Sequence, residues 1–284
     1  MDLTSETAAL VALLRAGQRP ARVYSELVED AGSAFAILQD EQGLLAGQLH
    51  EAAATELAHW TDQGMRVLTV LHPDYPENLR AVHDRPPLIF VAGALEPSDA
   101  RSVAVIGTRK PTAAGVASAR AIAEHLVQSN YTVASGLASG IDTTAHTAAL
   151  SNQGRTIAVI GTGLHRSYPA ENAPLQREIT DKCAVISQFW PDATPTRQSF
   201  PLRNAVMSGL ALATVVVEAT RTSGARIQAR LALAHGRPVL LAESLLEQQW
   251  ASEFAARPGT HVFHTPAEVV GIVERLTSAD ALVA

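Results

Sequence analysis

The chain has 284 residues, of which 47% are hydrophobic and 5% aromatic, and its formal net charge is −6. This length allows one large domain, or a large domain with a small companion, and supplies enough apolar residues for a full core. The single cysteine, Cys183, excludes an internal disulfide and a cysteine-cluster metal site. The longest apolar runs are far shorter than the roughly 20 residues of a membrane helix, and the N-terminus lacks a signal-type stretch. We therefore expect a cytoplasmic protein with no membrane segment.

The charge is distributed unevenly along the chain. Residues 1–100 carry 6 basic and 15 acidic side chains, residues 101–237 carry 14 and 7, and residues 238–284 carry 2 and 6. A basic centre thus stands between two acidic segments. Such a centre can attract a polyanion locally even though the whole chain is acidic.

Residues 1–63 are predicted to form a small all-α domain. Apolar residues recur at helical spacing in four segments, which are separated by Gly17, Gly32, Gly43 and Gly47. The expected helices are Thr4–Arg15, Pro20–Asp30, Ala34–Gln39 and Glu51–Gln63. The acidic surface of this segment is expected to face solvent or another protein rather than DNA.

Residues 64–284 are predicted to form a doubly wound α/β domain, extended Rossmann-like, around a mostly parallel sheet. Two strands, Met65–Leu71 and Leu88–Ala92, come first. Apolar strands and helical segments then alternate, and strands joined by helices run parallel with both faces covered. The further strands expected are Val103–Ile106, Thr132–Ala134, Thr156–Ile160, Ala184–Ser187, Thr214–Val217, Pro238–Ala242 and His261–Phe263. The helices expected between and after them are Gly115–Ser129, Gly140–Leu150, Asn172–Asp181, Leu202–Leu212, Gly224–His235 and Pro266–Thr277.

Four glycine-containing loops follow strands of this sheet. In doubly wound sheets, ligands bind at the carboxyl ends of the strands, and free N–H groups at the next helix can hold a phosphate. Glycine after a strand also occurs wherever the turn is tight, so one loop alone is a weak signal; four on one sheet edge are stronger. The loops contain Gly107, Thr108, Arg109 and Lys110; Ser135 and Gly136; Gly161 and Gly163; and Thr222, Ser223 and Gly224.

A second basic cluster, residues 197–204, precedes an apolar helix. Arg197 and Arg203 stand six residues apart and flank Phe200, and Asn204 follows. Arginines can hold phosphates, and an exposed aromatic ring gives a base a platform that tolerates any sequence. The alternative is that Phe200 packs in the core and both arginines are solvated.

Signals for catalysis are weak. The loops lack the spaced glycines of the dinucleotide fingerprint and of the Walker A motif, and the histidines lack metal-ligand spacing. Asp142 is expected to cap the helix that begins near Thr143, and His146 to be a hydrogen-bonded structural residue. Glu218 has no second carboxylate paired with it by spacing, so we expect it to cap a helix or pair with an arginine. We therefore expect no enzyme activity, no cofactor and no metal.

Several segments, in matching order, resemble the DprA family, also called Smf, of DNA-processing proteins. These are VAVIGTRKPTAAG, SGLASGIDTTAH, TIAVIGTGLHRSYPAEN, SFPLRNAVMSGL and VVVEATRTSGARIQARLALAHGRPV, preceded by HPDYPENLRAVHDRPPLIFVAGAL. The resemblance implies a homodimer that binds and protects incoming single-stranded DNA and loads the RecA recombinase during natural transformation. It also implies that residues 1–63 correspond to a domain similar to the sterile alpha motif.

The resemblance also assigns site residues by position. Arg109 is expected to hold a DNA phosphate, Ser135 and Gly136 to offer hydroxyl and backbone contacts, and Phe200 to stack on a base. The complete expected DNA-binding set is Gly107, Thr108, Arg109, Lys110, Ser135, Gly136, Gly161, Gly163, Arg197, Phe200, Arg203, Asn204, Ser223 and Gly224.

Two other functions stay open. Many members of the family carry a C-terminal winged-helix domain, and we expect none in this chain. Its absence mildly favours a SLOG-type sensor of a nucleotide-derived ligand. The second alternative is a nucleotide phosphoribohydrolase, and the members of that family share a Pro-Gly-Gly-x-Gly-Thr run. This chain has Thr220-Arg221-Thr222-Ser223-Gly224 there instead, which counts against catalysis.

Overall fold

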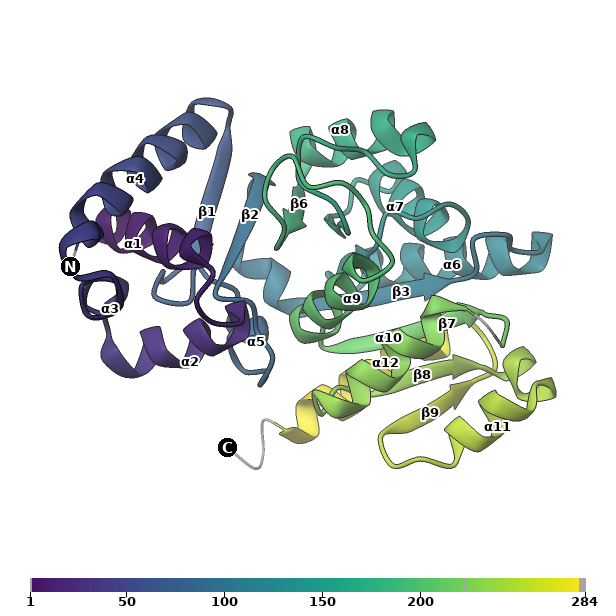
Figure 1. The fold of residues 1–284 in the computed structure, drawn as a ribbon. Helices are drawn as coiled ribbons and strands as arrows, with labels where there is room; N and C mark the ends of the chain where they lie inside the picture. Colours follow the sequence, from purple (N-terminus) through teal and green to yellow (C-terminus); the bar gives the residue numbers. More distant parts are fainter. Residues whose placement is uncertain (1, 222, 281–284) are drawn as a thin grey trace.

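A computed structural model describes residues 2–221 and 223–280. One nine-stranded sheet runs through the molecule, with helices on both of its faces and a group of helices at its N-terminal edge (Figure 1). Within these residues no helix combines the length and the apolar character needed to cross a membrane. The nine-stranded sheet with its covering helices confirms the predicted α/β class, and the helices before the first strand confirm the predicted helical N-terminal segment.

The N-terminal segment consists of four helices. They are α1 (Leu3–Ala16), α2 (Ala21–Ala31), α3 (Ala34–Gln42) and α4 (Ala46–Asp62). Asp2 and Ser33 cap α1 and α3 through their side chains, and Gly17 and Gly32 end α1 and α2 in the left-handed conformation. The last helix starts at Ala46 rather than at the expected Glu51, because the turn Gly43–Leu45 continues directly into it.

The helical segment packs directly on the sheet edge. The Trp60 ring lies 5.1 Å from that of Phe90 and 5.8 Å from that of Trp190, measured between centroids. One continuous apolar core runs from the first helix through the sheet to the last helix. The division of the chain at residues 63 and 64 stays a prediction.

The strand order is β1-β2-β6-β5-β4-β3-β7-β8-β9. From β6 to β9 all neighbours are parallel, whereas β2 runs antiparallel to both β1 and β6, so the sheet is mostly parallel as expected. The inner strands are buried along nearly their whole length, which explains their apolar runs. The strands are β1 (Met65–Thr69), β2 (Leu88–Gly93), β3 (Ser102–Gly107), β4 (Thr132–Ser135), β5 (Thr156–Val159), β6 (Ala184–Ser187), β7 (Ala213–Glu218), β8 (Val239–Ala242) and β9 (Thr260–Phe263).

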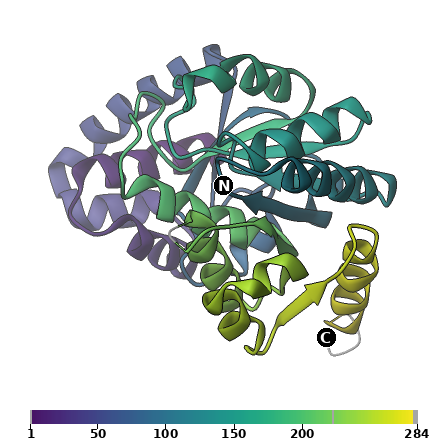
Figure 2. The same ribbon diagram turned by 90° about the vertical axis from the view of Figure 1, so that its right-hand side faces the viewer.

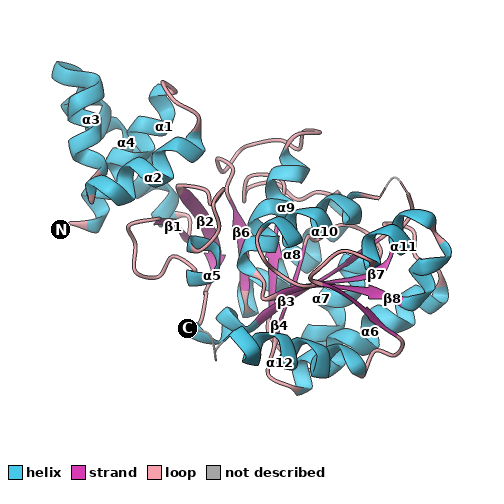
Figure 3. Ribbon diagram, turned by 90° about the horizontal axis from the view of Figure 1, so that it is seen from below, coloured by secondary structure: helices cyan, strands magenta, loops and turns pink. Residues whose placement is uncertain are grey.

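The connecting helices cover both faces of the sheet (Figure 3). They are α5 (Glu77–Arg80), α6 (Ala113–Gln128), α7 (Ile141–Ser151), α8 (Ala173–Lys182), α9 (Ser199–Leu210), α10 (Gly224–Ala234), α11 (Gln249–Ala255) and α12 (Glu268–Asp280). The last strand, β9, forms the sheet edge far from the N-terminal helices, and α12 packs against α6 (Figure 2). Two expectations need correction: α9 begins at Ser199 rather than Leu202, and α11 was not expected. Pro201 is tolerated in the first turn of α9, where its missing N–H has no helical partner.

The direction of chain progression across the sheet reverses between β3 and β7. From β3 the chain winds one way through β4, β5 and β6, and from β7 it winds the other way through β8 and β9. At such a reversal the loops after two adjacent strands diverge to opposite faces and leave a crevice. The loops that begin at Gly107 and Glu218 flank this point.

Candidate functional site

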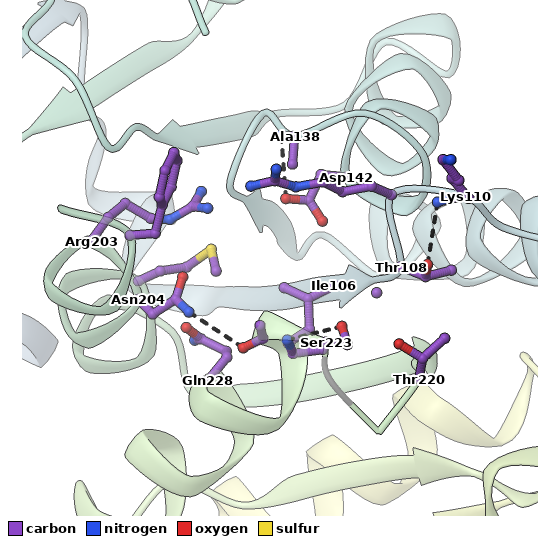
Figure 4. A pocket seen from close by; sticks show the side chains of 16 residues that line it. Ile106, Thr108, Lys110, Ala138, Asp142, Arg203, Asn204, Thr220, Ser223 and Gln228 are labelled. Carbon is purple, nitrogen blue, oxygen red and sulfur yellow. Dashed lines mark hydrogen bonds between the residues drawn. The ribbon is translucent and has the colours of Figure 1, made fainter. Parts of the chain in front are cut away.

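A cavity of about 590 Å³ opens at the reversal point, and we call it the switch-point cavity (Figure 4). The loop after β3, the start of α7, the first turns of α9 and the loop after β7 all contribute to it. Arg109 and Lys110 are exposed at its rim, while Arg203 and Asn204 are buried in its wall. The lining residues are Ile106, Gly107, Thr108, Arg109, Lys110, Ala138, Asp142, Phe200, Arg203, Asn204, Met207, Thr220, Ser223, Gly224, Ala225 and Gln228.

Glu218 fixes the loop that carries Arg109 and Lys110. The Thr108 N–H donates to the Glu218 carbonyl at 2.7 Å. The Glu218 carboxylate accepts from the Thr112 N–H at 3.1 and 3.2 Å and from the Thr112 hydroxyl at 2.9 Å. Thr112 in turn is the N-cap of α6. Glu218 therefore supports a helix start, in line with the structural role expected from the sequence, and leaves both cationic side chains free of it.

Two buried side chains of opposite charge, Arg203 and Asp142, belong to the wall of the cavity. Nη1 of Arg203 donates to the Val159 carbonyl at 2.9 Å, and its Nε has no partner in the described part of the chain. Burial raises the pKa of Asp142 and lowers that of Arg203, against their mutual attraction. Asp142 does not cap α7 as expected; its carboxylate accepts from the N–H groups of Gly136 and Ala138 in the preceding loop. The pair is thus part of the wall, with guanidinium donors still available.

His146 extends this buried pair without taking part in the cavity lining. Its Nδ1 lies 2.7 Å from the Thr156 hydroxyl, and the ring is fully buried. Burial, and then the charge of Arg203, lowers the pKa of His146 to about 3. The histidine is therefore neutral near pH 7, consistent with the structural role expected for it.

The Phe200 ring lies close to a cation and to a second aromatic side chain. The Arg109 Cζ lies 5.4 Å from the centroid of the Phe200 ring, and the centroid of the Tyr168 ring lies 5.6 Å from it. Tyr168 is 42% exposed and Phe200 is half-buried. A smaller hollow of about 160 Å³, the Tyr168 hollow, adjoins the switch-point cavity and shares Arg109, Ala138, Phe200 and Arg203 with it. Its lining is Arg109, Gly136, Ala138, Ser139, Gly161, Thr162, Tyr168, Pro169, Glu171, Phe200 and Arg203.

The structure brings most of the expected site residues together in these two cavities. Those present are Gly107, Thr108, Arg109, Lys110, Gly136, Gly161, Phe200, Arg203, Asn204, Ser223 and Gly224. Thr222, from the same loop as Ser223, lies outside the described residues. Whether any of them binds DNA stays a prediction.

Three expected residues do not line either cavity. The Ser135 hydroxyl is fully buried and donates to the Val105 carbonyl at 2.7 Å, so it cannot offer the expected hydroxyl contact. Gly163 is also buried, and a side chain there would overlap the carbonyls of Trp190 and Pro191. Its small size serves packing rather than a ligand. Arg197 is exposed on the segment before α9, away from both linings.

Sequence reasoning missed part of the lining. Tyr168, Thr220 and Gln228 belong to it, and Asp142 has a role other than the one expected. Tyr168 precedes Pro169 in a stretch between β5 and α8 that has no regular period, so nothing in the pattern marked it. Gln228 falls one helical turn after Gly224 on α10, and that spacing could have identified it.

Among the residues described, one group has the donor types of a metal site. Ligand atoms of His83, Asp84 and His235 all lie within 4.8 Å of one another. Both ring nitrogens of His235 are already engaged, at 2.7 Å from Asp84 and at 2.9 Å from the Ser208 hydroxyl. Ser208 is fully buried, so this Ser-His-Asp chain offers no accessible nucleophile either.

The sequence of this chain is similar to those of known proteins. Residues 66–274 match the family described as DNA recombination-mediator protein A. The chain is 40% identical over 176 residues to Protein Smf of Synechocystis, covering 61% of this chain and 44% of that relative, so it spans less than half of that protein.

Two solved structures share the fold. One is DNA processing protein A (DprA) from Streptococcus pneumoniae, with a TM-score of 0.72, 28% identity, and coverage of 94% of this chain and 95% of that one. The other, DNA processing protein A from Helicobacter pylori, has a TM-score of 0.66, 24% identity, and coverage of 76% and 96%; its structure is described as showing a single-stranded DNA binding mode. On the strength of the family match over most of its length, the chain belongs to the DNA recombination-mediator protein A family, that of DprA and Smf.

Proposed function

We propose that this chain binds single-stranded DNA in the switch-point cavity and the adjoining Tyr168 hollow. The observation that carries the proposal is the meeting of exposed Arg109, the half-buried Phe200 ring and the buried Arg203 at one wall of the cavity. The single-stranded DNA binding described for the relative from Helicobacter pylori supports it.

Each of these groups matches one part of a nucleotide. Arg109 and Lys110 are exposed cations on a loop tied down by Glu218, so they can meet a phosphate without being ordered first. The Phe200 ring, flanked by Tyr168, offers a face on which any base can stack. Phosphate contacts and ring stacking carry no sequence information, so binding through these groups is expected to depend on salt and to tolerate any sequence.

The acidic groups of the cavity do not suit a hydrolase. Asp142, in the cavity lining, faces Arg203 and accepts hydrogen bonds from two backbone N–H groups. Glu218, beside the cavity but outside its lining, is bound to Thr112. Hydrolysis by a pair of carboxylates would need one carboxyl group free to activate the nucleophile and another free to protonate the leaving group. We therefore propose binding without catalysis.

One observation favours a small-ligand sensor as the second candidate. A cavity of about 590 Å³ is within the usual range for small-molecule sites, and its glycine loops could hold one nucleotide-derived ligand. Protein stabilisation by mononucleotides, without oligonucleotide binding, would favour the sensor.

The finer parts of the function follow the resemblance. We propose that the chain protects incoming single-stranded DNA and loads RecA during natural transformation. We further propose that it acts as a homodimer in the cytoplasm. Stimulation of RecA strand exchange on DNA coated with single-strand-binding protein, and sedimentation analysis, would test these parts separately.

The first test is the anisotropy of a labelled oligothymidylate, with a duplex control, across a salt series. The variants are Arg109→Ala and, as a matched control, Arg177→Ala, an exposed arginine on α8 outside both cavities. We expect single-strand preference, a negative salt slope, and a loss of affinity in the first variant alone. Absence of binding at low salt would reject the DNA-binding function.

A further inference from the structure

A third hollow, between α10 and α11, is lined by four arginines. It has a volume of about 350 Å³, and no acidic residue contributes to its lining. We call it the arginine groove; its residues are Arg221, Ser223, Arg226, Ile227, Arg230, Phe254 and Arg257. The two helices lie next to each other on the same face of the sheet (Figure 3).

Two of these arginines are held in place by buried rings. The Arg226 Cζ lies 5.1 Å from the centroid of Trp250, and the Arg257 Cζ lies 4.9 Å from that of Phe254. Both rings are more than nine-tenths buried. Nη1 of Arg226 also donates to the Arg221 carbonyl. A guanidinium restrained in this way can bind a phosphate through its remaining N–H groups at a lower entropic cost than a mobile side chain.

The positive charge of the groove is not neutralised within the protein. Across residues 2–221 and 223–280, none of the four arginines forms an ion pair with a carboxylate. Arg221, Arg230 and Arg257 are exposed. Scattered surface arginines are ordinarily solvated, but four around one concave surface, in a chain of net charge −6, set up a local positive potential that favours a polyanion.

The groove adjoins the switch-point cavity at one residue. Ser223 lines both, so the two hollows meet at the start of α10. Ile227, which is 36% exposed, adds an apolar patch between the arginines, against which a sugar or base can lie. A chain of phosphates that leaves the switch-point cavity past Ser223 therefore meets further cations at once.

We propose that the arginine groove is a second backbone-binding segment, which holds the single-stranded DNA as it leaves the switch-point cavity. This inference rests on the proposed function and extends it: the cavity anchors a few nucleotides, and the groove sets the length of strand that is bound. An acidic polypeptide is the competing ligand for such a surface. The shared boundary at Ser223 favours the nucleic acid.

The test compares short and long oligothymidylates, of about 6 and about 20 nucleotides, across a salt series. The groove variant is the double substitution Arg221→Gln with Arg230→Gln, because both side chains are exposed and neither is stacked on a ring. The control is Arg120→Gln with Arg177→Gln, which makes the same charge change at exposed positions outside the three hollows. Urea unfolding verifies that each variant is folded.

We expect the groove variant to bind the long oligonucleotide roughly tenfold more weakly, with a salt slope reduced by about 1.4, since each lost phosphate contact on a single strand removes about 0.7. Binding of the short oligonucleotide should be unchanged, whereas Arg109→Ala should weaken both. If the groove variant and the control lose the same affinity for the long oligonucleotide, the inference is overturned. A loss of affinity in Arg109→Ala would in that case still support the proposed function. If the wild type binds neither length, both are rejected. If polyglutamate binding is lost in the groove variant and DNA binding is not, the groove belongs to an acidic protein.

Discussion

The guanidinium of Arg203 occupies the space that a side chain on Gly136 would need. A Cβ atom at position 136 would overlap Nη1 of Arg203. Arg203 is held there by the Val159 carbonyl and by the charge of Asp142. The glycine in the loop after β4 is therefore required by the buried arginine, and the two residues form one unit of the cavity wall.

Gly136→Ala should displace Arg203 and destabilise the fold by roughly 1–3 kcal/mol, as overpacking of a buried site does. The oligothymidylate affinity should fall as well. Gly224→Ala is the matched control, because it lies on the same cavity and a Cβ there meets no atom within 4 Å. Urea denaturation and anisotropy on both variants check this, and equal stability of the two would contradict the steric argument.

Glu218→Ala separates loop positioning from simple electrostatics. Removal of an acidic group near a phosphate site should strengthen binding if only charge matters. We expect weaker binding instead, because the Thr112 contacts that hold the loop of Arg109 are lost. Stability should fall by about 1 kcal/mol. Glu171→Gln, an exposed acid in the Tyr168 hollow, gives the pure charge effect for comparison, and tighter binding by both variants would show that the loop needs no support.

Phe200→Leu and Arg109→Gln should weaken binding in different ways. Loss of the ring should cost about 1–3 kcal/mol of binding free energy with little change in the salt slope, because stacking releases no counterions. Loss of the charge should reduce the slope by about 0.7. Tyr168→Phe keeps its ring and should bind like the wild type. Affinity measured at several salt concentrations checks all three, and a changed slope in Phe200→Leu would mean that the ring positions Arg109 rather than a base.

Stability should fall in mild acid because of His146. The folded protein keeps this side chain neutral down to a pKa of about 3, whereas the unfolded chain protonates it near its ordinary 6.5. The unfolded state therefore binds more protons between these values, and the free energy of unfolding should drop by about 1.4 kcal/mol per pH unit as the pH falls through that window.

Urea unfolding between pH 7 and pH 5 tests this, with His146→Gln as the comparison. The variant lacks the titrating ring, so the difference between the two proteins removes the contribution of Asp142 and other common groups. Its stability at pH 7 is expected to be lower, but its dependence on pH should be shallower. Parallel pH profiles would contradict the buried neutral histidine.

The sheet was predictable because its strands are apolar on both faces and alternate with helical periods. The loop glycines also located the cavity, since parallel strands end at one edge. The burial of Arg203 was not visible, because an arginine in a polar stretch reads as exposed unless its partner, Asp142, is known to face it. The start of α9 at Ser199 was missed because Pro201 looks like a helix stop rather than a first-turn residue.

The reversal of strand order also has a consequence for folding. The Thr112 and Glu218 contacts join groups 106 residues apart, and β3 pairs directly with β7 over a similarly long stretch of chain, as in the pairing of Val103 with Ala213. Contacts of this range form late, since a long loop must close before they contribute any stability. Neither half of the chain holds the whole lining of the cavity, so the cavity is complete only once synthesis has passed Gln228 of α10 and the two halves of the sheet have paired.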